Sequence, residues 1–184
     1  MTYEECCKVF CINDIQDLPA KVLEIVIGPI GKRDDIYREL LRINDFDVSY
    51  DWFQSIFEEE MSEGKRKGQH FTPKEIYSLL SQLSGDNAEL VHEPTAGNGG
   101  LIIGDWWRRC SQVNPWRWEP QKLIYYAWEL SQRSVPFLLL NLSIRGIQAE
   151  VTHGDVLEQS VIARYKIINE TNNPIAFSKV IRVE

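Results

Sequence analysis

A glycine-rich stretch near the middle of the chain carries residues suited to holding a nucleoside. It runs from Glu93 to Gly100 and reads Glu-Pro-Thr-Ala-Gly-Asn-Gly-Gly. It follows the segment 88–92, which is predicted to be a short buried strand. Glycines let a backbone approach a ligand closely, and the N–H groups that open a following helix point towards that ligand. The stretch therefore predicts a ligand-binding turn between a strand and a helix.

Two more carboxylates follow at the ends of the next predicted strands. Glu129 comes after a strand expected over 123–128, and Asp155 comes after a strand expected over 147–152. Ligands in open α/β sheets bind beyond the carboxyl ends of the strands. There, Glu129 can accept hydrogen bonds from both hydroxyls of a ribose, and Asp155 can accept one from an adenine amino group. The three sites together predict a pocket for an adenosine-containing cofactor.

The glycine spacing argues against a dinucleotide. A G-x-G-x-x-G loop that starts at Gly97 needs a third glycine where this chain has Ile102. Glu93 would also lie near a pyrophosphate, whereas the amino group and sulfonium of S-adenosylmethionine suit an acidic residue at that place. We therefore expect S-adenosylmethionine as the cofactor and keep a nicotinamide-dependent oxidoreductase as a remote alternative.

The elements that must position these residues alternate between strand and helix from residue 88 onward. Besides the three strands above, the pattern predicts helices over 99–109 and 131–145 and further strands over 164–168 and 179–183. This alternation is typical of a parallel sheet with crossover helices, which is an α/β, Rossmann-like fold.

The chain before the glycine stretch reads as mainly helical. Apolar residues have helical spacing after Leu18-Pro19 and again up to Ile43, and Ser49 can cap a third helix. We predict a helical N-terminal segment over 1–62 and a cofactor-binding domain over 63–184.

Composition excludes several classes of protein. The chain has 184 residues, of which 43% are hydrophobic, so it can bury a real core. It has no long apolar run and its first residues are acidic, so we expect no membrane segment, no signal peptide and a cytoplasmic protein. The spacing of its four cysteines and three histidines predicts no metal site.

A net charge of −7 argues against strong independent binding to nucleic acid. The one dense basic patch is Lys65-Arg66-Lys67, which could contact phosphates or form a solvated linker. Five tryptophans between Trp106 and Trp128 could stack on bases, but core and rim packing is the commoner role.

These motifs resemble the adenine-N6 DNA methyltransferases, above all the modification subunit of type I restriction–modification systems. The resemblance rests on Gly68-Gln69-His70-Phe71-Thr72-Pro73, on the stretch Glu93 to Gly100, and on His153-Gly154-Asp155-Val156-Leu157. Asn141-Leu142-Ser143-Ile144-Arg145-Gly146 is similar to the family's N-L-x-x-x-G helix end. Glu93 stands where the family usually has Asp, which keeps the charge and adds a methylene.

The resemblance implies a set of site residues. Those implied to bind the cofactor are Phe71, Thr72, Pro73, Glu93, Pro94, Thr95, Gly97, Gly99, Glu129 and Asp155. The family's catalytic Asn-Pro-Pro-aromatic motif has only a degenerate counterpart, in which Asn173 would position the target adenine's amino group, next to Pro174, and Phe177 would stack on the flipped base. The alternative for Asn172-Asn173-Pro174 is a plain turn.

Two functions stay open at this point. The chain could be an S-adenosylmethionine-binding, adenine-N6 methyltransferase-like protein of a restriction–modification system, with DNA and a specificity or full-length modification subunit as partners. Alternatively, it could be a non-catalytic, truncated methyltransferase module with a regulatory or antirestriction role.

Overall fold

The chain begins with three short helices. A computed structural model of the protein describes residues 2–56 and 88–183. The helices are α1 (Tyr3–Phe10), α2 (Leu18–Val26), which follows a 3₁₀ turn at Ile15–Asp17, and α3 (Ile30–Ile43). Thr2 and Glu5 form a capping box at the start of α1, and a proline lies in the first turn of α2. The predicted helical character of the N-terminal segment is confirmed over these residues.

The described residues 88–183 contain a five-stranded sheet in the order β1-β2-β3-β4-β5. The strands are β1 (Leu90–Glu93), β2 (Ile124–Glu129), β3 (Gln148–Asp155), β4 (Ser160–Ile168) and β5 (Lys179–Arg182). The helix α6 (Gly100–Ser111) connects β1 to β2, and α7 (Val135–Ile144) connects β2 to β3. Short 3₁₀ turns at Pro115–Arg117 and Pro120–Lys122 lead from α6 into β2.

The sheet is mixed, so the prediction of a parallel sheet is right for only part of it. β1, β2 and β3 run parallel, whereas β4 is antiparallel to β3 and β5 is antiparallel to β4. The connections explain the difference. Four residues join β3 to β4 and residues 169–178 join β4 to β5, whereas a parallel connection needs a crossover of a dozen or more residues.

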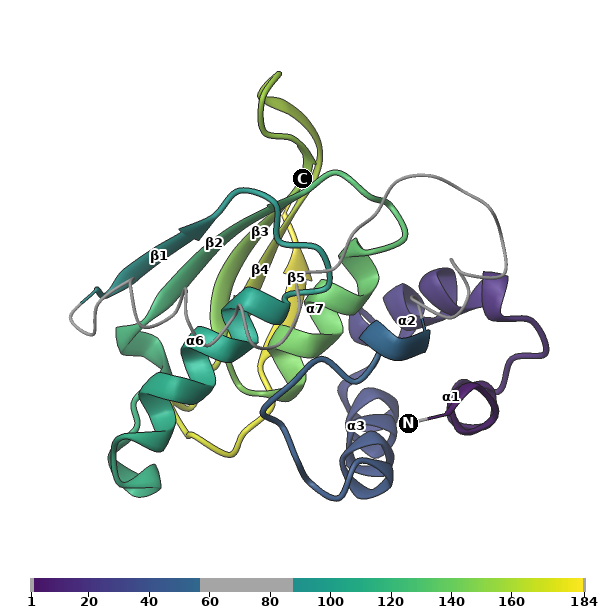
Figure 1. The fold of residues 1–184 in the computed structure, drawn as a ribbon, viewed down its shortest axis with the longest axis horizontal. Coiled ribbons are helices and arrows are strands. Elements are labelled where there is room, and N and C mark those ends of the chain that lie inside the picture. The colour runs from purple at the N-terminus through teal and green to yellow at the C-terminus, as the bar shows by residue number, and fades with distance from the viewer. Residues whose placement is uncertain (1, 57–87, 184) are drawn as a thin grey trace.

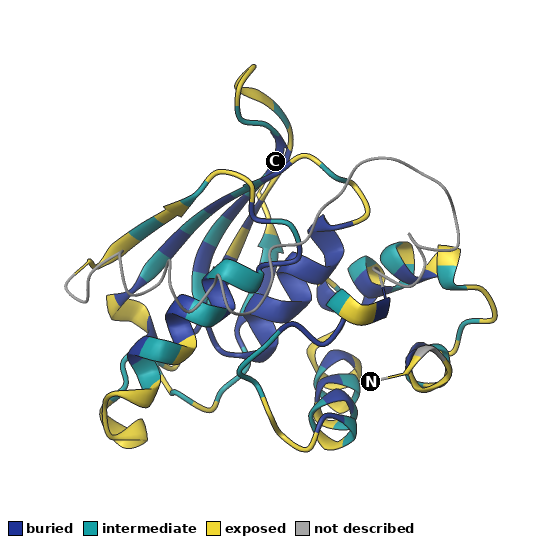
Figure 2. Cartoon of the chain, viewed as in Figure 1, coloured by how far each residue is buried: buried dark blue, intermediate teal, exposed yellow. Residues whose placement is uncertain are grey.

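The helix α7 is the centre of the hydrophobic core. Every residue from Val135 to Ile144 is buried, and Figure 2 shows this helix in the buried colour along its length. α6 and α7 lie over the same face of the sheet (Figure 1). A helix that is apolar on all sides needs neighbours all round, and the N-terminal helices cover the side of α7 that the sheet leaves open.

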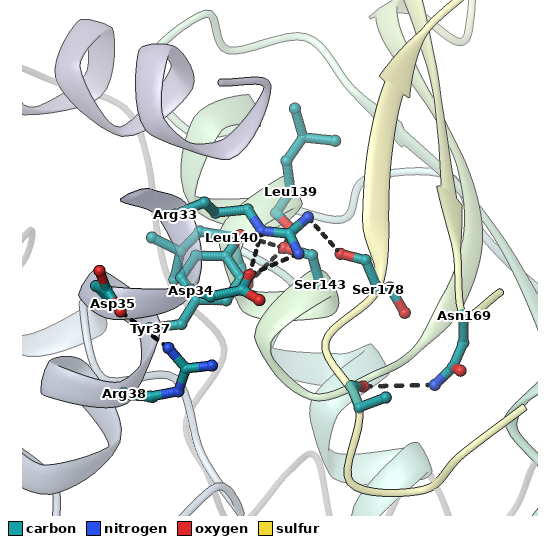
Figure 3. Close-up of polar contacts among 11 residues, drawn as sticks. Arg33, Asp34, Asp35, Tyr37, Arg38, Leu139, Leu140, Ser143, Asn169 and Ser178 are labelled. Atoms are coloured by element: carbon teal, nitrogen blue, oxygen red, sulfur yellow. Dashed lines mark hydrogen bonds and ion pairs between the residues drawn. The ribbon is translucent and has the colours of Figure 1, made fainter. Parts of the chain in front are cut away.

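Polar contacts fasten α3 to this central helix and to the loop before β5. The Tyr37 hydroxyl lies 2.5 Å from the Ser143 Oγ of α7, and the Arg33 guanidinium donates to the Ser178 carbonyl at 3.0 Å (Figure 3). α2 packs along α7, and one hydrophobic cluster contains residues of α1, α2, α3, α6, α7 and the sheet. Within residues 2–56 and 88–183, no helix has the length and apolar character needed to cross a membrane.

Candidate functional site

The glycine stretch forms a turn between β1 and α6, as predicted. Gly97 and Gly99 have φ angles of +56° and +96°, in the left-handed region that favours glycine. A Cβ atom on Gly99 would lie 2.9 Å from Leu138 Cδ1, so a larger residue would also crowd α7. The turn therefore needs glycine at this position for both its backbone angle and its close packing.

The turn is attached to the carboxyl end of β2. The Glu129 carboxylate accepts hydrogen bonds from the N–H groups of Gly97 and Ser131, each at 2.7 Å. The N–H of Ala96 donates to the carbonyl of Trp128 at 2.8 Å. Glu129 is only 8% exposed. Because water has little access to it, these backbone donors stabilise its charge. A carboxylate has about four acceptor positions, which leaves capacity for further donors such as hydroxyls.

Glu93 and Asp155 occupy the same edge of the sheet, at the ends of β1 and β3. Glu93 Oε1 accepts from the N–H of Thr95 at 3.1 Å and from its hydroxyl at 3.3 Å. Asp155 Oδ1 accepts from the N–H groups of Leu157 at 2.8 Å and Glu158 at 3.2 Å, which shapes the turn into β4. In the described part of the chain, the second oxygen of each carboxylate makes no hydrogen bond, and both residues are partly exposed.

The structure thus brings together the described cofactor candidates. Glu93, Glu129 and Asp155 are the last residues of three adjacent parallel strands, and each lies two residues beyond the register partner of the one before. The glycine turn bridges the first two strands. Such an edge, with three carboxylates and a turn that opens a helix, suits a ligand that carries hydroxyl and amino donors and positive charge. Phe71, Thr72 and Pro73 lie outside the described residues, as do Lys65, Arg66 and Lys67.

His153 is a neighbour of this edge whose position the sequence analysis did not use. It pairs with Glu129 in the register of β2 and β3 and is 8% exposed. Within the described residues, its Nε2 atom is buried without a hydrogen-bond partner. Its place directly before Gly154-Asp155 puts His153 near the end of β3 in the sequence. Only the strand register shows that it lies beside Glu129.

The residues considered for catalysis lie at the opposite edge of the sheet. β4 runs back towards the amino ends of β1 to β3, so the loop 169–178 lies near Gly146 and the start of β3 (Figure 1). Asn173 donates its N–H to Asn169 Oδ1 at 3.1 Å, and its own Oδ1 accepts from the N–H of Ile175 at 3.0 Å. This is the geometry of a turn stabilised by asparagine side chains.

The aromatic residue of the same loop is engaged in packing. The Phe177 ring meets the Tyr37 ring edge to face, with centroids 5.2 Å apart. Pro174, next to the exposed Asn173, is partly buried. The structure therefore does not bring Asn173, Pro174 and Phe177 together with the glycine turn, because the β3–β4 hairpin reverses the chain before they are reached.

Trp128 adjoins the glycine turn, because its carbonyl accepts from the N–H of Ala96. Three of the other tryptophans are remote from this turn or engaged in packing. Trp106 is buried, and Trp118 packs against the core. Trp116 is 80% exposed and belongs to the 3₁₀ turn Pro115–Arg117. The segment between α6 and β2 lies at the amino edge of the sheet (Figure 1). The Gln121 side chain joins this segment to the loop 169–178 by donating to the Asn169 carbonyl at 2.8 Å.

A separate hollow of about 650 Å³ lies between α2 and the start of α7. Its lining includes Leu23, Ile27, Arg133 and Pro136, and none of the described cofactor candidates lines it. The hollow is therefore distinct from the carboxylate edge, although Arg133 comes only four residues after Glu129.

Two comparisons with known proteins indicate the family of the chain. The family model described as N-6 DNA methylase matches residues 42–175. The chain is also similar to the type I restriction enzyme HindI methylase subunit of Haemophilus influenzae, with 30% identity over 98 residues. That match covers 53% of this chain and 21% of the Haemophilus protein, so the chain corresponds to about one fifth of that protein's length.

Proposed function

Because the chain belongs to the N-6 DNA methylase family, we propose that it binds S-adenosylmethionine at the carboxyl edge of β1, β2 and β3. The observation that carries the proposal is the bond between the Gly97 N–H and Glu129. It ties the glycine turn to the second carboxylate at 2.7 Å and so fixes part of the shape of this edge. A turn that is held by such a bond within the protein spends less binding free energy on becoming ordered.

Each carboxylate has a distinct role in this proposal. Glu129 accepts hydrogen bonds from the ribose hydroxyls, and Asp155 accepts one from the adenine amino group. Glu93 and the glycine turn hold the positively charged methionine part, together with Phe71, Thr72 and Pro73. Pro94, Thr95 and Gly99 keep the turn in shape. When bound, the cofactor supplies an activated methyl group, which the family transfers to the N6 atom of adenine in DNA.

The proposed biological role is in a restriction–modification system. The similar Haemophilus protein is a methylase subunit of a type I restriction enzyme. We propose DNA as a partner, contacted in part by Lys65, Arg66 and Lys67, with a specificity or modification subunit supplying further contacts. The net charge of −7 is consistent with weak binding to DNA by this chain alone.

The position of the loop 169–178 favours a second candidate function. Asn173 and Phe177 are held in a turn at the amino edge of the sheet, remote from the proposed cofactor site. On this observation, the chain by itself is a non-catalytic cofactor-binding module, which acts in a regulatory or antirestriction role or receives its catalytic residues from elsewhere.

Isothermal titration with S-adenosylmethionine and S-adenosylhomocysteine tests the proposed cofactor site. We expect Glu129→Gln to weaken binding by about tenfold or more, because the variant loses a charge-assisted acceptor. Glu150→Gln is the matched control, because Glu150 lies on β3 in a half-exposed ion pair with Lys166. Absence of binding by the wild-type chain, or equal losses in the two variants, would contradict the proposal.

A tritium-transfer assay on unmethylated DNA separates the two candidate functions. We expect no incorporation by the isolated chain, even when the titration shows cofactor binding. Incorporation that disappears in Asn173→Ala would instead support catalysis by this chain and would require the loop 169–178 to take another position. Incorporation that is unaffected by Asn173→Ala would place the catalytic residues elsewhere in the chain.

A further inference from the structure

A fully buried asparagine of α7 contacts the backbone of the glycine turn. Asn141 Nδ2 donates to the Asn98 carbonyl at 2.9 Å and to Asp51 Oδ1 at 2.9 Å, while Asn141 Oδ1 accepts from Arg145 at 3.0 Å. A carbonyl and a carboxylate only accept, and a guanidinium only donates, so the orientation of the amide is unambiguous. Both hydrogens of one amide group thus join two segments that are far apart in sequence.

The bond to Asn98 fixes a peptide plane inside the turn. The carbonyl of Asn98 and the N–H of Gly99 belong to the same planar peptide unit. The N–H of Gly99 donates to the Ala96 carbonyl at 2.8 Å, so this peptide is held from both sides. It lies between the two glycines with positive φ angles, where the backbone has the most freedom. Without Asn141, one of its two anchors is lost.

The bond to Asp51 attaches the turn to the segment that follows α3. Asp51 Oδ1 also accepts from the N–H of Phe53 at 2.9 Å. Arg145, one helical turn after Asn141, donates to the carbonyls of Val48 at 2.8 Å and Tyr50 at 2.6 Å. Its guanidinium lies 4.8 Å from the centroid of the Trp52 ring, within reach of a cation–π interaction.

The cluster is buried, so its bonds are not weakened by exchange with water. Asn141 is 0% exposed, Arg145 4% and Asp51 6%. A buried charge that loses its partner is costly, which favours one arrangement of the cluster over others. Burial raises the pKa of Asp51 and lowers that of Arg145 to about 10, and the attraction between the two groups opposes both shifts.

We infer that Asn141 is a positioning residue for the cofactor site, and that Asp51 holds the Asn141 amide in the orientation that fixes the Asn98–Gly99 peptide. The segment 48–53 contributes none of the proposed cofactor ligands, but it sets the shape of the turn through this amide. The inference rests on the proposed function for its binding readout, whereas its structural part can be tested without a ligand.

The chain offers a matched control at the other edge of the sheet. Asn169 is also 0% exposed, and its side chain holds the loop 169–178 through the carbonyls of Gly146 at 3.1 Å and Asn173 at 2.9 Å. Asn169→Ala and Asn141→Ala each remove one buried amide with several hydrogen bonds. A general loss of stability would affect both variants, whereas a positioning role would affect the turn in only one.

The binding test uses S-adenosylhomocysteine, titrated at a temperature at which thermal melts show both variants to be folded. We expect Asn141→Ala to raise Kd by about tenfold, the order expected when one buried hydrogen bond is lost. Asp51→Ala should follow it in direction, and Asn169→Ala should stay within about twofold of wild type. Equal effects of Asn141→Ala and Asn169→Ala, or a wild-type Kd in Asn141→Ala, would overturn the inference.

The ligand-free test measures amide hydrogen exchange at Gly99 and Gly97 by NMR. We expect faster exchange at Gly99 in Asn141→Ala, by about tenfold, and no change in Asn169→Ala. An unchanged Gly99 rate in Asn141→Ala overturns the inference whether or not a cofactor binds. If wild type binds no cofactor while Gly99 exchange responds, the proposed function fails and the positioning role stands. Should Asn141→Ala not fold, Asn141→Ser is the substitute, because its short side chain cannot span both partners.

Discussion

At the scale of single residues, Glu129 shows how backbone N–H groups hold a carboxylate at the end of β2. A buried carboxylate is costly unless it accepts hydrogen bonds, and here the N–H groups of Gly97 and Ser131 supply them. The same bonds hold the glycine turn against β2. Glu129 thus anchors the glycine turn, and the N–H groups that it anchors stabilise its buried charge.

The cysteines allow a prediction at this scale, because the thiol of Cys6 is buried and that of Cys110 is partly buried. Burial raises the pKa of Cys6 from 9.0 to about 12 and that of Cys110 to about 11. Only the thiolate reacts with alkylating agents. We expect iodoacetamide at pH 8 to modify the exposed Cys11 first and Cys6 only on unfolding, as measured by mass spectrometry of timed samples.

The same shift gives Cys6 a signature in the dependence of stability on pH. Its folded pKa is raised, so the stabilisation is fully present below pH 9 and is lost as the pH rises towards 12. Between pH 8 and pH 10, ionisation of one such thiol in the unfolded chain lowers the free energy of unfolding by about 1 kcal/mol. Urea unfolding of Cys6→Ala should therefore show a shallower decline than wild type over this range. Cys11→Ala should decline like wild type, and a decline as shallow as that of Cys6→Ala would contradict the assignment.

At the scale of elements, the contact between α3 and α7 depends on a buried pair of hydroxyls. Ser143 donates its one hydroxyl hydrogen to the Leu139 carbonyl at 2.7 Å, so it accepts from Tyr37. Burial raises the pKa of Tyr37 above its usual range, which keeps the phenol protonated as a donor. The pair joins a helix of the N-terminal segment to the helix that carries Asn141 (Figure 3).

A double-mutant cycle measures this contact between the elements. We expect Tyr37→Phe and Ser143→Ala each to lower the free energy of unfolding by about 1–2 kcal/mol in urea. The double variant should lose about 1 kcal/mol less than the sum, because each single change already breaks the shared bond. Strict additivity would show that the two hydroxyls do not interact in solution.

At the scale of the whole molecule, the N-terminal helices and the sheet share one hydrophobic core. α7 is buried at every residue because the sheet covers one side and the N-terminal helices cover the other. The predicted boundary between 62 and 63 therefore divides a chain whose parts pack on the same helix. The match to the family model is consistent with this, since it begins at residue 42, inside α3.

Removal of the N-terminal segment tests this shared core. We expect a chain of residues 63–184 to lack a cooperative thermal transition, because it would expose one whole side of α7 to water. Far-UV and near-UV circular dichroism of the truncated and complete chains provide the comparison. A sharp transition in the truncated chain, near that of the complete protein, would instead support an independent cofactor-binding domain.

The sequence by itself determined the local features of the molecule. The backbone freedom of glycine predicts the turn at 97 and 99, and apolar periodicity predicts the strand before it and the helix after it. The same periodicity predicts where the strands end, and therefore that the carboxylates lie at strand ends. The strands that begin at 90, 124, 148 and 179 agree with the predicted ranges to within a few residues.

Only the tertiary structure decided the direction of β4, the place of Asn173 and the role of Asn141. A two-residue period shows which face of a sheet a side chain occupies, but the direction of a strand is set by pairing with residues distant in sequence. The β3–β4 hairpin carries Asn173 to the amino edge, away from the glycine turn. Asp51, Asn98 and Asn141 meet only because three elements pack around one buried amide, and no spacing along the chain encodes that meeting.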